Sequence, residues 1–353
     1  MAFFTDKWTI AEISSNNTIL VRKSKKTIIL ERVVGDTSIN SREVIARDIL
    51  EEYDVAVDKK NNIYILYQNK EGHLILNVLK GNNKEEIQLT SEALSEVFEL
   101  NMVVKDKIIH IFYFIRVSDV EMKYRLYHHH YDENKWNDSI VDEISVNRVL
   151  NPIKLIQTDS NILLLYYSSD KKIELREFSI DKLEWNSKVT PISTENDKMF
   201  LDAIKINDII HISYGEFING NLVIKYNSLH YNEEQCEILQ EQYISNEGSP
   251  SHPNIILYEN KLWVTWIELN KIMSRHSEDM GQNWEPIIYM WNQSRDIDFV
   301  RYKYLTKVSK ENVLLEHSFG SIYPRVTFMG FGPIDNVTEV PVKKKESMSI
   351  LRI

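Results

Sequence analysis

Ser277-Glu278-Asp279-Met280-Gly281-Gln282-Asn283-Trp284 is the stretch of this sequence that bears most directly on the fold. It fits the pattern S-x-D-x-G-x-x-W, in which short oxygen side chains accept hydrogen bonds from turn N–H groups and a glycine permits a positive φ. The tryptophan ends the pattern as a large apolar anchor. The stretch therefore predicts a self-bonded turn between two strands, with Trp284 starting the second strand and wedged between neighbouring sheets.

Degenerate copies of the surrounding segment recur about every fifty residues along the chain. Each copy contains a short apolar run, rich in β-branched and aromatic residues, that follows a polar turn. Five clear runs begin at Ile63, Ile108, Ile162, Ile209 and Leu262, and weaker runs occupy residues 17–22 and 312–317. A spacing of about 45 to 54 residues suits one four-stranded blade per repeat. The sequence predicts a single all-β propeller of seven four-stranded blades, or of six if the first copy is not a blade.

The two ends of the chain predict how the ring closes. The last repeat is one strand short, because the turn-like segment 330–333 stops it. We expect residues 2–7 to supply the missing outer strand, since an open sheet edge would otherwise remain. This assigns residues 1–333 to the propeller. Residues 334–353 are left as a C-terminal tail or linker that leads to another module or to an oligomer contact.

Composition excludes several classes of function. A net charge of −10 disfavours binding to nucleic acid, and no apolar run is long enough for insertion into a membrane. Cys236 is the only cysteine, so no intrachain disulfide forms, and we interpret it as a small buried hydrophobe. The N-terminus lacks the features of a signal peptide, which favours the cytoplasm, with surface association by another export route as the alternative. No phosphate-binding or metalloprotease motif is present, and we expect no cofactor.

Three further repeats keep fragments of the Ser277–Trp284 pattern. Their Asp132, Asp181 and Asn232 each stand four residues before Trp136, Trp185 and Cys236. With one full copy and these fragments, the chain resembles the Asp-box propellers, the sialidase-like group with BNR repeats. The resemblance covers roughly residues 8–332. It implies a structural role for Ser277, Asp279, Gly281 and Trp284, because such boxes lie at the periphery of the blades.

The resemblance also implies a test for enzymatic activity. A sialidase would carry three arginines for the substrate carboxylate, a tyrosine nucleophile with a glutamate partner, and an aspartic acid. The Arg-Ile-Pro segment that usually holds the first arginine is absent. Arg301 starts the last repeat and Arg325 lies in Tyr323-Pro324-Arg325, but a third matching arginine is missing. Arg116 is a candidate only by its position in a loop. The catalytic set of sialidases is therefore not matched.

In a propeller the loops that enter first strands, and those that join second to third strands, share one rim around the channel. Ligand-binding candidates in these positions are Tyr53, Asp54, Arg116, Asn151, Asp202, His252, Glu268, Arg301, Tyr302 and Arg325. We interpret the chain as a non-catalytic binding or scaffold module that recognises a protein or a glycan. The alternative is a carbohydrate-active enzyme, a glycoside hydrolase or lyase, that uses Asp202, Glu216, Glu268 and His252 at the channel mouth.

The run His128-His129-His130 places His128 and His130 on one strand face and His129 on the other. No further ligand at suitable spacing completes a metal site, so we predict exposed histidines of an edge strand. His110 and His211 occupy equivalent positions in their repeats, which indicates a packing role between blades.

Overall fold

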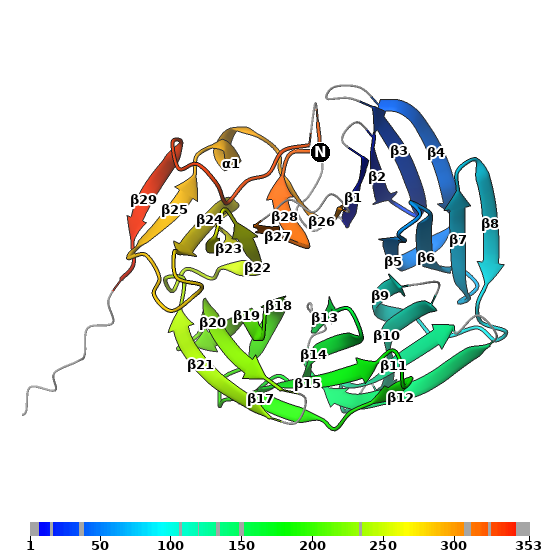
Figure 1. The fold of residues 1–353 in the computed structure, drawn as a ribbon, viewed down its shortest axis with the longest axis horizontal. Coiled ribbons are helices and arrows are strands. Elements are labelled where there is room, and N and C mark those ends of the chain that lie inside the picture. Colours follow the sequence, from blue (N-terminus) through cyan, green and yellow to red (C-terminus); the bar gives the residue numbers. More distant parts are fainter. Residues whose placement is uncertain are drawn as a thin grey trace, which may run out of the picture.

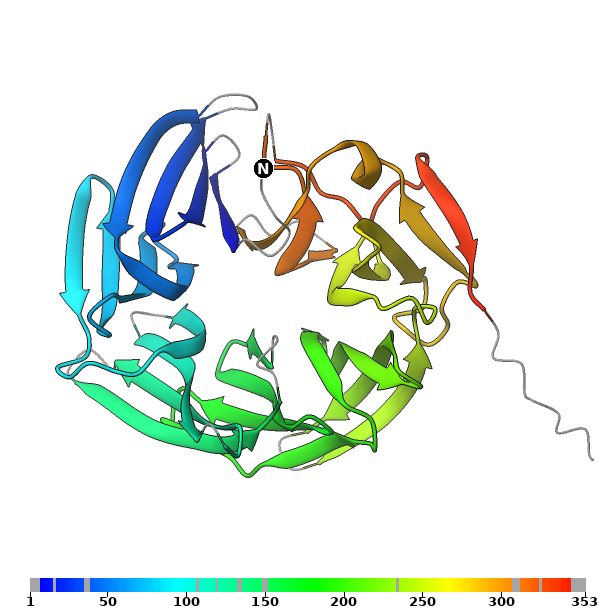
Figure 2. The same cartoon turned by 180° about the vertical axis from the view of Figure 1, so that it is seen from behind.

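The computed structural model describes residues 7–14, 17–34, 39–105, 108–118, 120–131, 135–147, 152–232, 235–306, 312–323 and 326–343. The strands form sheets arranged in a ring around a central axis, as Figures 1 and 2 show from opposite faces. One short helix, α1 (Gln293–Asp296), accompanies them. This confirms the predicted all-β propeller. In the described part of the chain no helix is long and apolar enough to cross a membrane.

The strands follow the sequence repeats, and the first strand of each repeat lies innermost in the ring (Figure 1). The first three repeats contain β1 (Trp8–Ser14), β2 (Asn17–Ser24), β3 (Thr27–Val34) and β4 (Ile39–Arg47); β5 (Ile49–Val57), β6 (Ile63–Asn69), β7 (Leu74–Lys80) and β8 (Asn83–Gln88); and β9 (Val97–Lys105), β10 (Ile108–Ser118), β11 (Lys123–Tyr131) and β12 (Trp136–Ser145). The next two contain β13 (Ile153–Gln157), β14 (Asn161–Ser169), β15 (Lys172–Ser179), β16 (Glu184–Trp185) and β17 (Val189–Ser193); and β18 (Lys198–Ile206), β19 (Ile209–Ile218), β20 (Asn221–Tyr231) and β21 (Cys236–Tyr243). The last two contain β22 (Ser251–Tyr258), β23 (Lys261–Glu268), β24 (Lys271–Ser277) and β25 (Ile287–Trp291); and β26 (Val300–Thr306), β27 (Val313–Leu314) and β28 (His317–Gly320), which β29 (Val337–Pro341) follows.

The predicted count of seven separate four-stranded blades is wrong. The described strands form a nine-stranded sheet, two six-stranded sheets and two four-stranded sheets. The nine-stranded sheet arises because β12 pairs with β14 through Ser145 and Ser169, which joins two neighbouring repeats. One six-stranded sheet joins the first repeat to the last. In the last repeat, β27 pairs with β22 rather than with β26, so no regular blade forms there.

An N-terminal strand closes the ring, but the pairing differs from a simple outer strand. β1 runs parallel to β26, with Trp8 opposite Tyr302 and Glu12 opposite Thr306. The two innermost strands of the first and last repeats thus meet directly. Residues 2–6, which we expected to form the missing outer strand, lie outside the described residues.

The segment 334–353 contributes a strand of its own. β29 pairs antiparallel with β25 and becomes an additional outer strand of the β22–β25 repeat, at the red edge of Figure 1. The side chain of Asn246 donates a hydrogen bond to the Pro341 carbonyl at 3.2 Å, and Lys343 N–H donates to Asn246 Oδ1 at 2.8 Å. A further module or an oligomer contact beyond this strand stays a prediction.

Apolar side chains gather between neighbouring repeats rather than within single sheets. One cluster joins Leu66 of β6 to Ile111 of β10, and another joins Tyr226 of β20 to Val264 of β23 and to Trp284. Because both faces of a blade are covered by other blades, its central strands read as near-continuous apolar runs. These interfaces hold the inner strands in place around the centre of the ring.

The Ser277–Trp284 box forms the self-bonded turn that its sequence predicts. Ser277 donates to Asp279 Oδ1 at 2.7 Å, and Asn283 donates to the two carboxylate oxygens of Asp279 from its N–H and its Nδ2, both at 2.7 Å. Gly281 has φ +87, and a Cβ there would come within 2.0 Å of the Tyr226 hydroxyl. Trp284 does not start the next strand as expected, because β25 begins three residues later, at Ile287.

Asp279→Ala is expected to lower the free energy of unfolding by about 1–2 kcal/mol, because three hydrogen bonds to the carboxylate are lost. The measurement is chemical denaturation at neutral pH. The matched control is the adjacent Glu278→Ala, which removes exposed contacts with Lys261 and His276 and is expected to leave stability nearly unchanged. Equal stability of Asp279→Ala and wild type would contradict a structural role for the box.

Candidate functional site

A polar residue recurs at one position on the innermost strands, which we call the polar slot. In five repeats this residue of the first strand pairs with a residue of the second strand that is followed directly by an aromatic residue. The members of the slot are Asp54, Asn101, Lys154, Asp202 and Asn254, opposite Leu66, Phe112, Leu165, Ser213 and Thr265. The repeat architecture therefore brings five polar side chains to the same level around the centre of the ring.

A β-bulge precedes the polar slot in several repeats. The register between first and second strands shifts ahead of Tyr53, Asn101, Asp202 and Asn254. Three residues at these bulges hold a positive φ: Glu99 (51), Phe200 (60) and His252 (53). Positive φ is unfavourable for such residues, and bulges with strained backbone are frequent next to functional sites, where they redirect side chains.

Three members of the polar slot connect one repeat to the next. Asp54 Oδ2 accepts a hydrogen bond from Met102 N–H at 2.7 Å, and Asp202 Oδ2 accepts one from Ile255 N–H at 2.8 Å. Asn254 Oδ1 accepts a hydrogen bond from Arg301 Nε at 2.9 Å. These side chains therefore have a structural role as well as any role in binding.

The starts of the inner strands enclose a cavity of ≈ 170 Å³, which we call the channel-mouth cavity. Six of the residues named from the sequence line it: Tyr53, Asp54, Asp202, His252, Arg301 and Tyr302. It is also lined by residues that the sequence analysis did not name, chiefly Trp8, Glu99, Lys154, Lys303, Glu316 and His317. Ligand binding by any of them stays a prediction.

Most charged side chains that line the cavity form ion pairs with one another. Lys154 Nζ lies 2.7 Å from both Asp202 Oδ1 and Glu316 Oε2, and Lys303 Nζ lies 2.8 Å from Asp54 Oδ1. Burial alone would raise the pKa of Glu316, but the positive charges of Lys154 and Lys303 hold it below its usual value. The Glu316 carboxylate is therefore ionised at neutral pH and is not poised as a proton donor.

Two imidazoles in the cavity are neutral. Burial, followed by the charge of Arg301, lowers the pKa of His252 to about 4. The same causes lower the pKa of His317 well below its ordinary value. The His252 ring packs against Phe200 with centroids 4.4 Å apart. Among the described groups, the buried Trp8 Nε1 and His317 Nδ1 have no hydrogen-bond partner, so a bound molecule that supplies one would be favoured there.

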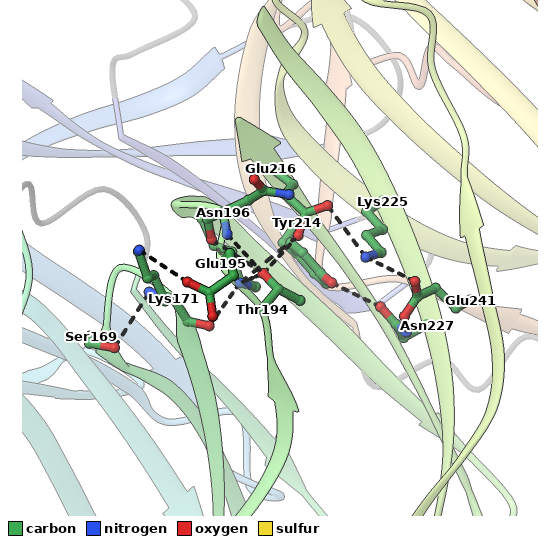
Figure 3. Close-up of polar contacts among 11 residues, drawn as sticks. Ser169, Lys171, Thr194, Glu195, Asn196, Tyr214, Glu216, Lys225, Asn227 and Glu241 are labelled. Atoms are coloured by element: carbon green, nitrogen blue, oxygen red, sulfur yellow. Dashed lines mark hydrogen bonds and ion pairs between the residues drawn. The ribbon is translucent and has the colours of Figure 1, made fainter. Parts of the chain in front are cut away.

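Other predicted residues do not reach this cavity. Glu216 is fully buried in a separate network, where its carboxylate lies 3.3 Å from Lys225 Nζ and accepts a hydrogen bond from Thr194 at 3.0 Å (Figure 3). Glu268 accepts a hydrogen bond from Trp266 Nε1 at 3.1 Å. Arg116 is exposed and lies over the ring of Tyr124. Glu216 and Glu268 are therefore not assembled with Asp202 and His252 into one site.

Asn151 and Arg325 lie outside the described residues, so their predicted places at the rim are not tested.

Two of the cavity residues that were not predicted from the sequence, Lys154 and Lys303, stand at positions that the sequence pattern marks. Lys154 stands in the polar slot, in the register of Asp54 and Asp202. Lys303 follows Arg301 by two residues and so shares its strand face. Glu316 gave no such signal, because it lies between the short strands β27 and β28.

The prediction that His128 and His130 are exposed on an edge strand is wrong. β11 lies between β10 and β12, and His128 and His130 are 0% and 8% exposed. They stack near His110, whose Nδ1 lies 3.0 Å from His128 Nε2, and they pack against Phe178 of the next repeat. Among the described residues, no group of three or more His, Cys, Asp or Glu side chains is arranged to hold a metal ion.

Comparisons with known proteins support the fold and leave the family open. No family model matches the chain, and no curated protein matches it. Similar solved structures include an ulvan lyase of a polysaccharide lyase family (TM-score 0.51, 10% identity, 86% of this chain and 90% of that chain). They also include the fucose-specific lectin of Aleuria aurantia (0.49, 14%, 81% and 95%) and a GH43 endo-arabinanase of Bacillus licheniformis (0.38, 11%, 73% and 98%). At these identities the likeness concerns the fold alone.

Proposed function

We propose that the chain is a non-catalytic binding propeller of the Asp-box type that recognises an anionic glycan at the channel-mouth cavity. The observation that carries the proposal is the state of Arg301. Its Nε is fixed by Asn254, while no carboxylate of the described residues lies within 4.0 Å of its guanidinium. The other cations of the cavity, Lys7, Lys154 and Lys303, each pair with a carboxylate.

The carboxylates of Asp202, Glu316 and Glu99 act on this guanidinium only at longer range. An anionic ligand that contacts the buried guanidinium directly would therefore be favoured. Burial lowers the pKa of Arg301, yet an arginine stays charged at neutral pH. Trp8 and Tyr302 add aromatic surface to the same cavity. A small concave site with aromatic walls and a few fixed polar groups is typical of a ligand pocket. Carboxylates and sulfate groups on sugars fit this arrangement.

Arg301→Ala is expected to weaken binding to acidic glycans by about tenfold or more, with little change for neutral glycans. The measurement is a glycan array that contains uronate, sialate, sulfated and neutral saccharides, followed by titration of the best binder. Arg125→Ala is the matched control, because Arg125 forms an exposed ion pair with Glu143 away from the cavity. Each variant is compared only if its melting temperature matches wild type.

Failure of the array to show any acidic ligand would contradict the proposal, as would full binding by Arg301→Ala. A panel of hydrolase and lyase substrates run beside the array tests for turnover. Turnover removed by Asp202→Asn would overturn a purely binding role.

A carbohydrate-active enzyme is the second candidate, and His252 is the observation that favours it. Its imidazole is neutral at pH 7, sits on a strained bulge and lines the cavity beside Arg301. An imidazole with a pKa of about 4 is a weak base, but a bound anionic substrate would raise this pKa. A guanidinium can neutralise a uronate carboxylate during proton abstraction from the adjacent carbon. Turnover of a uronate polymer that is lost in His252→Ala would support a lyase.

A further inference from the structure

An ion pair crosses the centre of the ring at the inner end of the channel-mouth cavity. Lys154 belongs to β13 and Glu316 lies between β27 and β28, and these strands stand on opposite sides of the centre in Figure 1. Lys154 Nζ and Glu316 Oε2 are only 2.7 Å apart. We call this pair the cross-channel bridge. Because it joins two opposite walls, it obstructs the path that would otherwise run along the axis of the ring.

The cross-channel bridge is held on both sides. Lys154 is 5% exposed, and its Nζ also lies 2.7 Å from Asp202 Oδ1. Burial alone would lower the pKa of Lys154, but the charges of Asp202 and Glu316 raise it, so the side chain stays an ammonium. Opening the bridge would leave charges uncompensated where little water reaches them, which is unfavourable. Glu316 also lines two pockets farther along the inner strands, so the bridge stands between those spaces and the channel-mouth cavity.

The space in front of the bridge is small. Its volume is ≈ 170 Å³, and a cavity of about 150 Å³ accommodates one six-membered ring such as benzene. Two linked sugars do not fit side by side in such a space. A sugar inside a chain has a neighbour on each side, whereas a terminal sugar has a neighbour on one side only. A cavity that is closed at its inner end therefore favours the end of a chain.

Arg301 is oriented to receive one carboxylate. Its Nε donates a hydrogen bond to Asn254 Oδ1 at 2.9 Å, which fixes the plane of the guanidinium. Within the described part of the chain, its Nη1 and Nη2 have no hydrogen-bond partner. Two neighbouring nitrogens of a guanidinium match the two oxygens of a carboxylate. A sugar ring that carries a carboxylate, a uronate, combines the charge and the size that this cavity accepts.

We propose that the channel-mouth cavity binds the terminal uronate residue of a glycan chain and does not bind uronates inside the chain. The carboxylate pairs with Nη1 and Nη2 of Arg301, and the ring fills the space in front of the cross-channel bridge. This inference rests on the proposed function, because it specifies which acidic glycan the same cavity takes. Its distinguishing consequence is that affinity does not depend on the length of the chain.

The experiment is titration calorimetry of the full chain with the methyl glycosides of glucuronate and of galacturonate, and with their 1,4-linked tetramers and decamers. We expect at least one of the two monosaccharides to bind saturably, with a dissociation constant within about fivefold of that of its decamer, counted per mole of chain. Arg301→Ala should weaken the binding of monosaccharide and decamer by the same factor, about tenfold or more. Arg125→Ala is the control and should change neither.

A decamer that binds more than about fivefold tighter than its monosaccharide would overturn the inference, because sugars beyond the end would then contribute to binding. Binding of sulfated or other acidic glycans without binding of either uronate would also overturn it. In both cases acidic glycans still bind, so the proposed function survives. If no acidic glycan binds on the array, the proposed function fails and this inference fails with it. The length series uses the wild-type protein and so remains informative if Arg301→Ala does not fold.

Discussion

Trp284→Ala is expected to lower the free energy of unfolding by about 3–5 kcal/mol, as for other large-to-small changes in a core. Trp284 is only 7% exposed and packs edge to face against Tyr226 of the preceding repeat, with ring centroids 4.9 Å apart. Its carbonyl also accepts a hydrogen bond from Arg275 at 3.3 Å. Removing the indole therefore opens a cavity between two repeats. The measurement is the midpoint and slope of urea-induced unfolding.

Trp284→Phe is the matched control, and it should cost less, about 1–2 kcal/mol. A phenyl ring keeps the contact with Tyr226. It also removes an indole N–H that is buried without an acceptor among the described groups. Trp284→Ala with the unfolding midpoint of wild type would show that this residue does not anchor the repeat.

Acidification from pH 6.5 to pH 5 is expected to destabilise the protein by several kcal/mol. Burial lowers the pKa of His211 and of His252 to about 4, and that of His110 to about 3. Below pH 6.5 these histidines therefore bind protons in the unfolded chain but not in the folded chain. The free energy of unfolding falls as the pH falls from 6.5 to 5. Each of His211 and His252 costs about 2 kcal/mol at pH 5, since that pH is about 1.5 units below the ordinary pKa.

The measurement is the free energy of unfolding at pH 6.5, 6.0, 5.5 and 5.0, a range in which ordinary carboxylates have barely begun to titrate. His211→Gln should reduce the slope of the free energy of unfolding against pH, measured near pH 5, by about 1.4 kcal/mol per pH unit. This reduction corresponds to one proton. The control is His230→Gln, because His230 lies exposed on the same repeat. Stability that is constant or rises on acidification would contradict the prediction.

The sequence allowed the second strands to be predicted because their apolar runs stand between polar turns. Ile63–Asn69 and Ile209–Ile218 are strands as expected. The pairings at the edges could not be predicted in this way. Val337–Pro341 looks like a tail, and only the free edge of β25 turns it into a strand. Likewise Ser145 and Ser169 have no pattern that marks them as partners, since their pairing depends on how two repeats approach each other.

The candidate site was predictable where it follows the repeat. Asp54, Asp202 and His252 come from equivalent first strands, so ring symmetry brings them to one cavity. Glu216 and Glu268 also come from equivalent positions, but their side chains are held by local partners, Lys225 and Trp266. The sequence period predicts how far along the axis of the ring a residue lies. It does not give the direction in which neighbouring groups hold its side chain.

The parallel contact between β1 and β26 has a consequence for protein synthesis. β1 leaves the ribosome before the other described strands, and its partner β26 is made nearly 300 residues later. The Asp54–Lys303 ion pair spans a comparable separation of 249 residues along the chain. During most of translation the edge of β1 therefore lacks its partner and could pair with other nascent chains. We expect slow translation or chaperone binding to matter most for this strand, until the last repeat emerges and completes the circle.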